Sequence, residues 1–172
     1  MDIKKICLTL PNEFTIGILG GGQLGKMIAA ECGKLSIKAI CLSPNRNAPA
    51  SFFCKQIVGE LDNKKKLSIL NKHSDVITYE IEHLNTEIIK KVIPEDKIYP
   101  SIKTLEIIQD KYLQRSFLKR HNLPVPDFFD LKNVDDIEKH LPCVQKLKKS
   151  GYDGRGVAVI KTKKDLYKTL KG

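Results

Sequence analysis

The stretch Thr15-Ile-Gly-Ile-Leu-Gly-Gly-Gly-Gln-Leu-Gly25 is an apolar run that breaks into three consecutive glycines and then enters a helix-forming sequence. It predicts a strand, a tight turn and a helix N-terminus in immediate succession. Backbone amides without side chains at a helix N-terminus can hold an anion, most often a phosphate. The stretch therefore predicts both an α/β fold and a first binding site.

A dinucleotide-binding protein is the first alternative, because the stretch contains Gly20-x-Gly22-x-x-Gly25. The next predicted strand, Lys38 to Leu42, is followed by Ser43-Pro44-Asn45. No Asp or Glu stands there to bind a ribose hydroxyl, which weakens the assignment to a nicotinamide or flavin enzyme.

Strand-like and helix-like segments alternate along the first hundred residues. The predicted strands are 15–19, 38–42, 56–58, 75–79 and a short one around Ile98, and the predicted helices are 23–35, 63–71 and 86–91. This order implies a parallel sheet wrapped by helices, with ligands at the carboxyl ends of the strands. The glycine turn and Tyr79-Glu80 both fall at such ends.

The character of the sequence changes near Pro100, where we place a domain boundary. Ser101 can cap a helix over 102–109. The segments that follow are a helix over 111–121, an extended strand over 127–130 after two prolines, a helix over 134–140 and a strand over 143–147.

Composition excludes several classes of function. The chain has 172 residues, 41% of them apolar, without an apolar run long enough to span a bilayer or to serve as a secretion signal, so residues 1–14 are expected to be an arm of a cytoplasmic protein. The net charge of +10 comes from 30 basic residues, of which only four are arginine, and this pattern disfavours nucleic-acid binding.

The five cysteines lack zinc or disulfide spacing and are expected to be free thiols, and no metal site is predicted. The triplet Lys64-Lys65-Lys66 is expected to be a solvated helix face.

A second glycine-rich segment, Ser150-Gly-Tyr-Asp-Gly-Arg-Gly156, lies between the strand candidates 143–147 and 157–160 and predicts a hairpin. Its backbone could fold over a triphosphate while Arg155 and Lys146 supply charge. A plain hairpin turn is the alternative, because glycine and aspartate are ordinary turn residues.

Four motifs in this order and spacing resemble the 5-(carboxyamino)imidazole ribonucleotide synthase family of ATP-grasp enzymes. They are Gly20-Gly-Gly-Gln-Leu-Gly25, Thr78-Tyr-Glu-Ile-Glu-His-Leu84, Ile108-Gln-Asp-Lys-Tyr-Leu113 and Gly151-Tyr-Asp-Gly-Arg-Gly156. The resemblance runs from about Thr15 to the end of the chain, and similar modules occur fused to a carboxylase. It implies a Rossmann-like pre-ATP-grasp domain over 15–100 and, over 101–172, the beginning of an ATP-grasp domain with a glycine-rich lid hairpin.

The resemblance implies a reaction of purine biosynthesis in which ATP, bicarbonate and 5-aminoimidazole ribonucleotide give the carbamate, ADP and phosphate. Such ligases are thought to phosphorylate bicarbonate first, in a closed site that excludes water. It also implies a homodimer of the full-length protein.

Carried over position by position, the resemblance assigns two sets of residues. The ATP-binding set is Lys111, Lys146, Gly151, Tyr152, Asp153, Gly154, Arg155 and Gly156. The set near the aminoimidazole ribonucleotide is Gly22, Gln23, Leu24, Glu80, Glu82 and His83. Tyr152 and Asp153 are also the candidate catalytic residues, with Asp153 orienting the amine. The alternatives are that Tyr152 packs, that Asp153 shapes the turn, and that Glu82 and His83 form a solvated pair or helix cap.

The sequence departs from the family at Lys111, where arginine is frequent, and at Ser43, where aspartate is common. The family's Mg²⁺ ligands are expected downstream of Gly172, so we expect this chain alone to lack turnover. A non-catalytic module that binds a nucleotide or phosphate is the alternative from another class.

Overall fold

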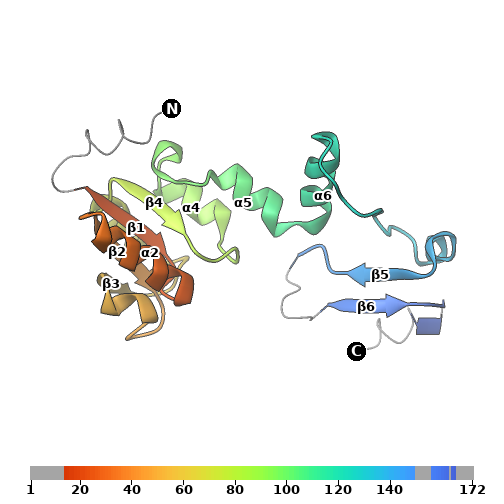
Figure 1. The fold of residues 1–172 in the computed structure, drawn as a ribbon, viewed down its shortest axis with the longest axis horizontal. Coiled ribbons are helices and arrows are strands. Elements are labelled where there is room, and N and C mark those ends of the chain that lie inside the picture. Colours follow the sequence, from red (N-terminus) through yellow and green to blue (C-terminus); the bar gives the residue numbers. More distant parts are fainter. Residues whose placement is uncertain (1–13, 150–155, 163, 166–172) are drawn as a thin grey trace. The chain divides into compact units, whose positions relative to one another are not determined.

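A computed structural model describes residues 14–149, 156–162 and 164–165 of the chain. The described residues form two compact units that divide between Leu105 and Glu106 (Figure 1). The predicted arm, residues 1–14, lies outside the described residues except for Phe14, whose carbonyl accepts a hydrogen bond from the Lys38 amide at 3.0 Å.

The first unit is built on a sheet of four parallel strands in the order β3-β2-β1-β4. These strands are β1 (Thr15–Leu19), β2 (Lys38–Ser43), β3 (Lys55–Val58) and β4 (Val76–Tyr79). The predicted parallel sheet is confirmed, and β1 lies inside it, between β2 and β4. The short strand predicted around Ile98 is a single parallel bridge between Ile77 and Ile98.

Helices cover both faces of this sheet. They are α2 (Gln23–Lys34), α3 (Lys64–Lys72) and α4 (Thr86–Val92), close to the predicted ranges. Consecutive residues of a strand point to opposite faces. Ile18 accordingly packs with Ala29 of α2 in one apolar cluster, whereas Leu19 packs with Leu67 and Ile89 of α3 and α4 in another. The glycine turn therefore leaves the sheet from between two packed layers.

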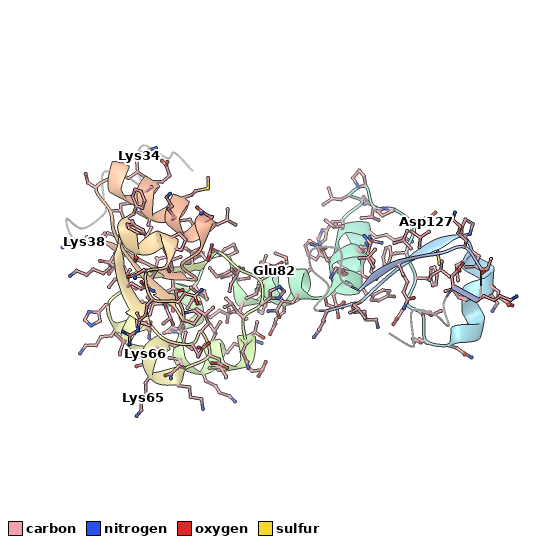
Figure 2. The ribbon with its side chains drawn as sticks, turned by 90° about the horizontal axis from the view of Figure 1, so that it is seen from below. Lys34, Lys38, Lys65, Lys66, Glu82 and Asp127 are labelled. Atoms are coloured by element: carbon pink, nitrogen blue, oxygen red, sulfur yellow. The ribbon has the colours of Figure 1, made fainter. Side chains whose placement is uncertain are left out.

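The lysine triplet opens α3 and is mostly solvated, as predicted. Lys65 is exposed and points away from the sheet (Figure 2). Lys66 is half-buried because its aliphatic stem covers Gly59, where an added Cβ would lie 2.7 Å from Lys66 Cγ. Asn63 caps the helix, since its Oδ1 accepts from the Lys65 and Lys66 amides at 3.0 and 3.2 Å.

The segment after Pro100 begins with α5 (Ile102–Gln109), at the predicted cap. Ser101 Oγ accepts a hydrogen bond from the Thr104 amide at 3.2 Å. Ile102 and Leu105 are buried in the core of the first unit. The domain limit near Pro100 stays a prediction.

The second unit contains α6 (Lys111–Arg120), η3 (Val134–His140), β5 (Cys143–Lys146) and β6 (Val157–Ile160). β5 and β6 pair antiparallel, which confirms the predicted hairpin. A small core of Ile137 and Ile160 lies on one face of the hairpin, together with the half-buried Cys143 and Ala158.

One predicted element of this unit was wrong, and a predicted helix has the expected bounds but the 3₁₀ form. Residues 127–130 form no strand, because no ladder partner is present in the described part of the chain, and an extended segment without one is not a strand. The helix predicted over 134–140 is a 3₁₀ helix, the tighter form that short helical segments adopt. Across the described residues, the helices are too short or too polar for any of them to span a membrane.

Candidate functional site

The glycine turn after β1 requires bare backbone at two positions. Gly20 has a φ of +110°, and its amide donates to the Leu42 carbonyl at 2.9 Å. A side chain at Gly20 would collide with Glu80. At Gly21, an added Cβ would lie 2.8 Å from the Cβ of Ser43. The turn therefore depends on glycine because its neighbours approach from both sides.

Glu80 clamps this turn from the end of the neighbouring strand β4. Its Oε1 accepts a hydrogen bond from the Gly22 amide at 2.6 Å, and its Oε2 accepts one from the Gly25 amide at 2.8 Å. A carboxylate is favoured there, because the helix dipole is positive at its N-terminus and charge-assisted bonds are strong. Glu80 thus fixes the start of α2 and occupies two amides that a ligand could have used.

Two further amides at the start of α2 remain open. Gln23 and Leu24 are exposed, and within the described ranges neither of their amides donates a hydrogen bond. The first turn of α2 carries no acidic residue. The predicted contacts Gly22, Gln23 and Leu24 therefore lie together, but a phosphate or hydroxyl would bind the last two, since the Gly22 amide is bonded to Glu80.

Glu82 and His83 follow Glu80 in the loop after β4. Glu82 is half-buried and His83 is exposed. The carbonyl of Glu82 accepts from the Leu84 amide at 2.9 Å, which turns the chain sharply at this point. Both residues lie beyond the carboxyl end of the strand, as expected, and their contact with a substrate stays a prediction.

The second unit holds Lys111 at the first position of α6. Asp110 caps this helix, because its Oδ1 accepts from the Tyr112 and Leu113 amides at 2.9 and 3.0 Å. The Lys111 amide instead donates to the Lys148 carbonyl at 2.9 Å. This bond ties the start of the helix to the chain that leaves β5.

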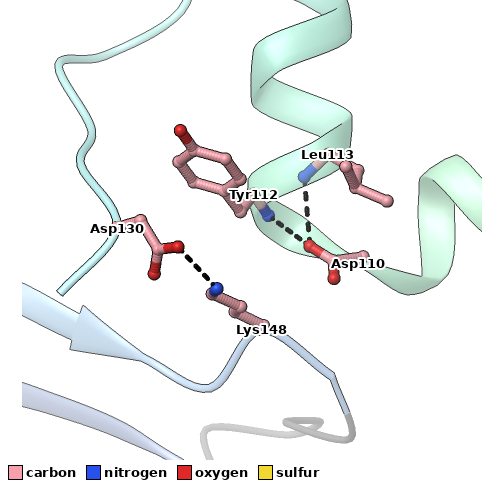
Figure 3. A network of polar contacts seen from close by, with 5 residues as sticks. All are labelled: Asp110, Tyr112, Leu113, Asp130 and Lys148. Carbon is pink, nitrogen blue, oxygen red and sulfur yellow. Dashed lines mark hydrogen bonds and ion pairs between the residues drawn. The ribbon is translucent and has the colours of Figure 1, made fainter. Parts of the chain in front are cut away.

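Lys148 is itself anchored by its side chain. Its Nζ lies 2.8 Å from Asp130 Oδ2 and 5.4 Å from the centroid of the Tyr112 ring (Figure 3). The hydrogen bond to Asp130 raises the pKa of Lys148. No local pattern in the sequence predicts this network, because Asp130 is 18 residues away from its partner.

Lys146 lies at the end of β5 and is exposed. It alternates with the inward-facing Gln145, so it shares the open face of the hairpin with Val144, Val157 and Val159. An exposed cation beside an apolar strip can contact a ligand that carries both an anionic and an apolar part.

The glycine-rich segment is described only at its end. Gly156 has a φ of +69°, and its carbonyl accepts from the Leu147 amide at 3.0 Å. The other predicted contacts lie outside the described residues: Gly151, Tyr152, Asp153, Gly154 and Arg155.

The cysteines in the described part of the chain are free thiols, as predicted: Cys32, Cys41, Cys54 and Cys143. The Cys54 thiol donates to the Ala50 carbonyl at 3.3 Å. Its interaction with the neighbouring Cys41 thiol raises the pKa of Cys54 and lowers the pKa of Cys41. Among the described residues, no group of three or more His, Cys, Asp or Glu is placed to hold a metal ion.

Comparisons with known families match two consecutive parts of the chain. Residues 14–109 match the family model of the ribonucleotide synthetase preATP-grasp domain, and residues 116–172 match that of the ATP-grasp domain. The chain therefore belongs to the ribonucleotide synthetase preATP-grasp family.

Individual proteins similar to this chain carry a more specific name than the family model does. The N5-carboxyaminoimidazole ribonucleotide synthase of Staphylococcus aureus strain COL is 32% identical over 163 residues, which are 91% of this chain and 44% of that protein. The crystal structure of N5-carboxyaminoimidazole ribonucleotide synthetase from Thermotoga maritima is 42% identical, with a TM-score of 0.82 over 92% of this chain and 44% of that one.

A third relative was solved with ligands. The N5-carboxyaminoimidazole synthase of Aspergillus clavatus, in complex with ADP and 5-aminoimidazole ribonucleotide, is 26% identical, with a TM-score of 0.79 over 93% of this chain and 44% of that one. The present chain thus spans less than half the length of the relatives that it matches.

Proposed function

We propose that this chain contributes to the ATP-dependent carboxylation of 5-aminoimidazole ribonucleotide with bicarbonate. The observation that carries the proposal is the start of α2, where Glu80 holds the glycine turn and leaves the Gln23 and Leu24 amides open. Relatives named N5-carboxyaminoimidazole ribonucleotide synthase match nearly the whole chain. A relative named N5-carboxyaminoimidazole synthase was solved with ADP and 5-aminoimidazole ribonucleotide.

In this proposal the first unit binds the ribonucleotide. The Gln23 and Leu24 amides, with the Gln23 side chain, donate to its phosphate or ribose oxygens at the positive end of α2. The oxygens of Glu80 keep these donors in place while they bind. Fixed donors lower the entropic cost of binding.

The second unit supplies charge for the nucleotide. Lys111 and Lys146 are the proposed phosphate contacts, and ATP is the proposed ligand. The proposed nucleotide contacts from the sequence are Gly151, Tyr152, Asp153, Gly154, Arg155 and Gly156. Tyr152 and Asp153 are also the proposed contacts of the aminoimidazole. Asp153 would accept hydrogen bonds from the amine and orient it for attack.

Mg²⁺ accompanies ATP in this proposal and would neutralise the charge on the transferring phosphoryl group. The described residues do not fit a site for it, because no cluster of carboxylates or other metal ligands occurs among them. The chain's own contribution is therefore binding and orientation.

The proposal extends to the organisation of the protein. We infer a pre-ATP-grasp domain over 15–100, an ATP-grasp segment over 101–172, a cytoplasmic location and a homodimer of the full-length protein. The two family matches support the presence and the order of these two domains, and they place the change from one to the other between residues 109 and 116. Analytical ultracentrifugation at micromolar concentration tests the dimer.

A substitution that removes one amide tests the ribonucleotide site. Gln23 is the first residue of α2, where proline is well tolerated, and Gly22 before it is extended, as a residue preceding proline should be. Gln23→Pro deletes the amide donor together with the side chain, and Gln23→Ala deletes the side chain alone.

We expect Gln23→Pro to bind 5-aminoimidazole ribonucleotide about tenfold more weakly than Gln23→Ala, since a hydrogen bond to a charged group contributes roughly 1.5–3 kcal/mol. Calorimetric titration measures both affinities, and urea unfolding confirms that the two variants are equally stable. Equal affinities of the two variants would contradict the proposed site.

A further inference from the structure

All four amides at the start of α6 are bonded within the protein. The Lys111 amide donates to the Lys148 carbonyl, the Tyr112 and Leu113 amides donate to the Asp110 side chain, and the Gln114 amide donates to the Asp110 carbonyl. This helix end therefore offers a nucleotide no backbone donor. Phosphate binding near α6 must come from side chains, and their position depends on what fixes the backbone.

Lys148 fixes that backbone and is already paired within the protein. Its ammonium pairs with Asp130 at 2.8 Å and lies over the Tyr112 ring (Figure 3). The Asp130 side chain is 20% exposed, against 51% for Lys148, so the carboxylate is the more sheltered partner. A partly sheltered pair with an aromatic neighbour holds its geometry better than an exposed ion pair.

We propose that Asp130 is a positioning residue for nucleotide binding. Its ion pair holds the main chain at Lys148, whose carbonyl fixes the start of α6 at Lys111. Lys146 lies two residues before Lys148 on the same segment. Asp130 thereby helps to fix the backbone that carries both candidate phosphate contacts, Lys111 and Lys146. This inference rests on the proposed function, because it requires Lys111 and Lys146 to bind phosphate.

The effect on affinity follows from the cost of ordering. Without its partner, the segment at Lys148 has to become ordered when the nucleotide binds, and that cost reduces the affinity. Loss of the Asp130 charge also has an opposite effect on affinity, because the released Lys148 ammonium would attract phosphate. The sign of the change in affinity therefore separates a positioning role from simple charge neutralisation.

The test uses the 172-residue chain, with ADP as the probe. Asp130→Asn removes the charge and retains the shape, and Asp130→Glu restores the charge. Asp136→Asn is the matched control, because Asp136 forms an exposed ion pair with Lys139 at 2.9 Å in the same unit. ADP affinity is measured by calorimetric titration, and exchange of the Lys111 amide with solvent is measured by NMR without any ligand.

We expect Asp130→Asn to weaken ADP binding about fivefold through lost preorganisation and to accelerate exchange of the Lys111 amide. Asp130→Glu should recover most of the affinity, and Asp136→Asn should change neither quantity. In a Lys111→Ala background, Asp130→Asn should cause a smaller further loss, because part of its effect acts through Lys111.

Unchanged or tighter ADP binding by Asp130→Asn, while the parent chain binds ADP, would overturn the positioning role and leave the proposed function standing. If the parent chain binds no ADP, the proposed function of the second unit fails and the inference fails with it. Unchanged exchange of the Lys111 amide in Asp130→Asn would overturn the structural step regardless of ligand.

Discussion

Gly20 and Gly33 show how differently two glycines of one strand-helix unit are constrained. Gly20 has a φ of +110° and faces Glu80, whereas nothing lies within 4 Å of a Cβ added at Gly33 in α2. The first position is fixed by the clamp that shapes the candidate site. The second is an exposed helix position.

We therefore expect Gly20→Ala to destabilise the fold by about 1–3 kcal/mol through backbone strain and the collision with Glu80. Gly33→Ala should stabilise it by about 0.5–1 kcal/mol, because alanine is the better helix former. Urea unfolding of the two variants measures both values. A Gly20→Ala variant as stable as the parent would contradict the described turn.

Tyr79 carries a second residue-scale prediction. In the described structure its hydroxyl is buried without a hydrogen-bond partner, and burial raises its pKa. Removing an unsatisfied hydroxyl is nearly neutral or stabilising, so Tyr79→Phe should change stability by about 0 to +1 kcal/mol at pH 7.

The same variant should alter the pH dependence. Burial disfavours the ionised phenolate in the folded state, so stability should fall as the pH rises above the unfolded pKa of about 10. Stability measured by urea unfolding between pH 8 and pH 11 should fall less steeply in Tyr79→Phe. An equally steep fall would show that Tyr79 does not titrate with unfolding.

At the residue scale, the sequence predicted which residues belong to the candidate site better than it predicted the contacts between them. The glycine turn and Glu80 were both predicted as parts of the ribonucleotide site. The clamp between them joins Glu80 to Gly22, 58 residues away, and no local pattern contains that contact. Tertiary pairing of this kind depends on strand order, which places β4 beside β1.

At the scale of elements, the cap of α6 joins helix stability to the candidate nucleotide site. Asp110 satisfies two amides of α6 with one carboxylate oxygen and a third with its carbonyl. Ser101 caps α5 in a similar manner, but its bonds are made to Thr104. Ser101 can therefore serve as the control for Asp110, because both residues cap a helix but only Asp110 caps the helix that carries Lys111.

Asp110→Ala should cost about 1–2 kcal/mol of stability, as the loss of an N-cap does, and Ser101→Ala should cost a similar or smaller amount. Only Asp110→Ala should also weaken ADP binding, because it loosens the helix turn that carries Lys111. Thermal unfolding and ADP titration separate the two effects. Equal loss of ADP affinity in both variants would indicate a general effect of stability.

Periodicity predicted most elements of the first unit, because most strands there are largely apolar runs bounded by turn residues. The second unit was predicted less well. Residues 127–130 have strand-forming phenylalanines, but pairing partners decide whether an extended segment becomes a strand. The segment 134–140 is short enough for the tighter 3₁₀ helix, which apolar spacing does not distinguish from an α-helix.

At the scale of the whole molecule, each unit carries a separate half of the proposed machinery. The first unit offers two open amides beside the Glu80 clamp, and the second offers Lys111 and Lys146 on a segment anchored by Asp130. Our central proposal is therefore that the two units bind two chemically different phosphate compounds.

The most direct measurement is an amide NMR titration of the chain, first with 5-aminoimidazole ribonucleotide and then with ADP. We predict that the ribonucleotide shifts the Gln23 and Leu24 amide signals, and that ADP shifts signals around Lys111 and Lys146. Failure of either compound to bind, or binding of both at the glycine turn alone, would contradict the proposal.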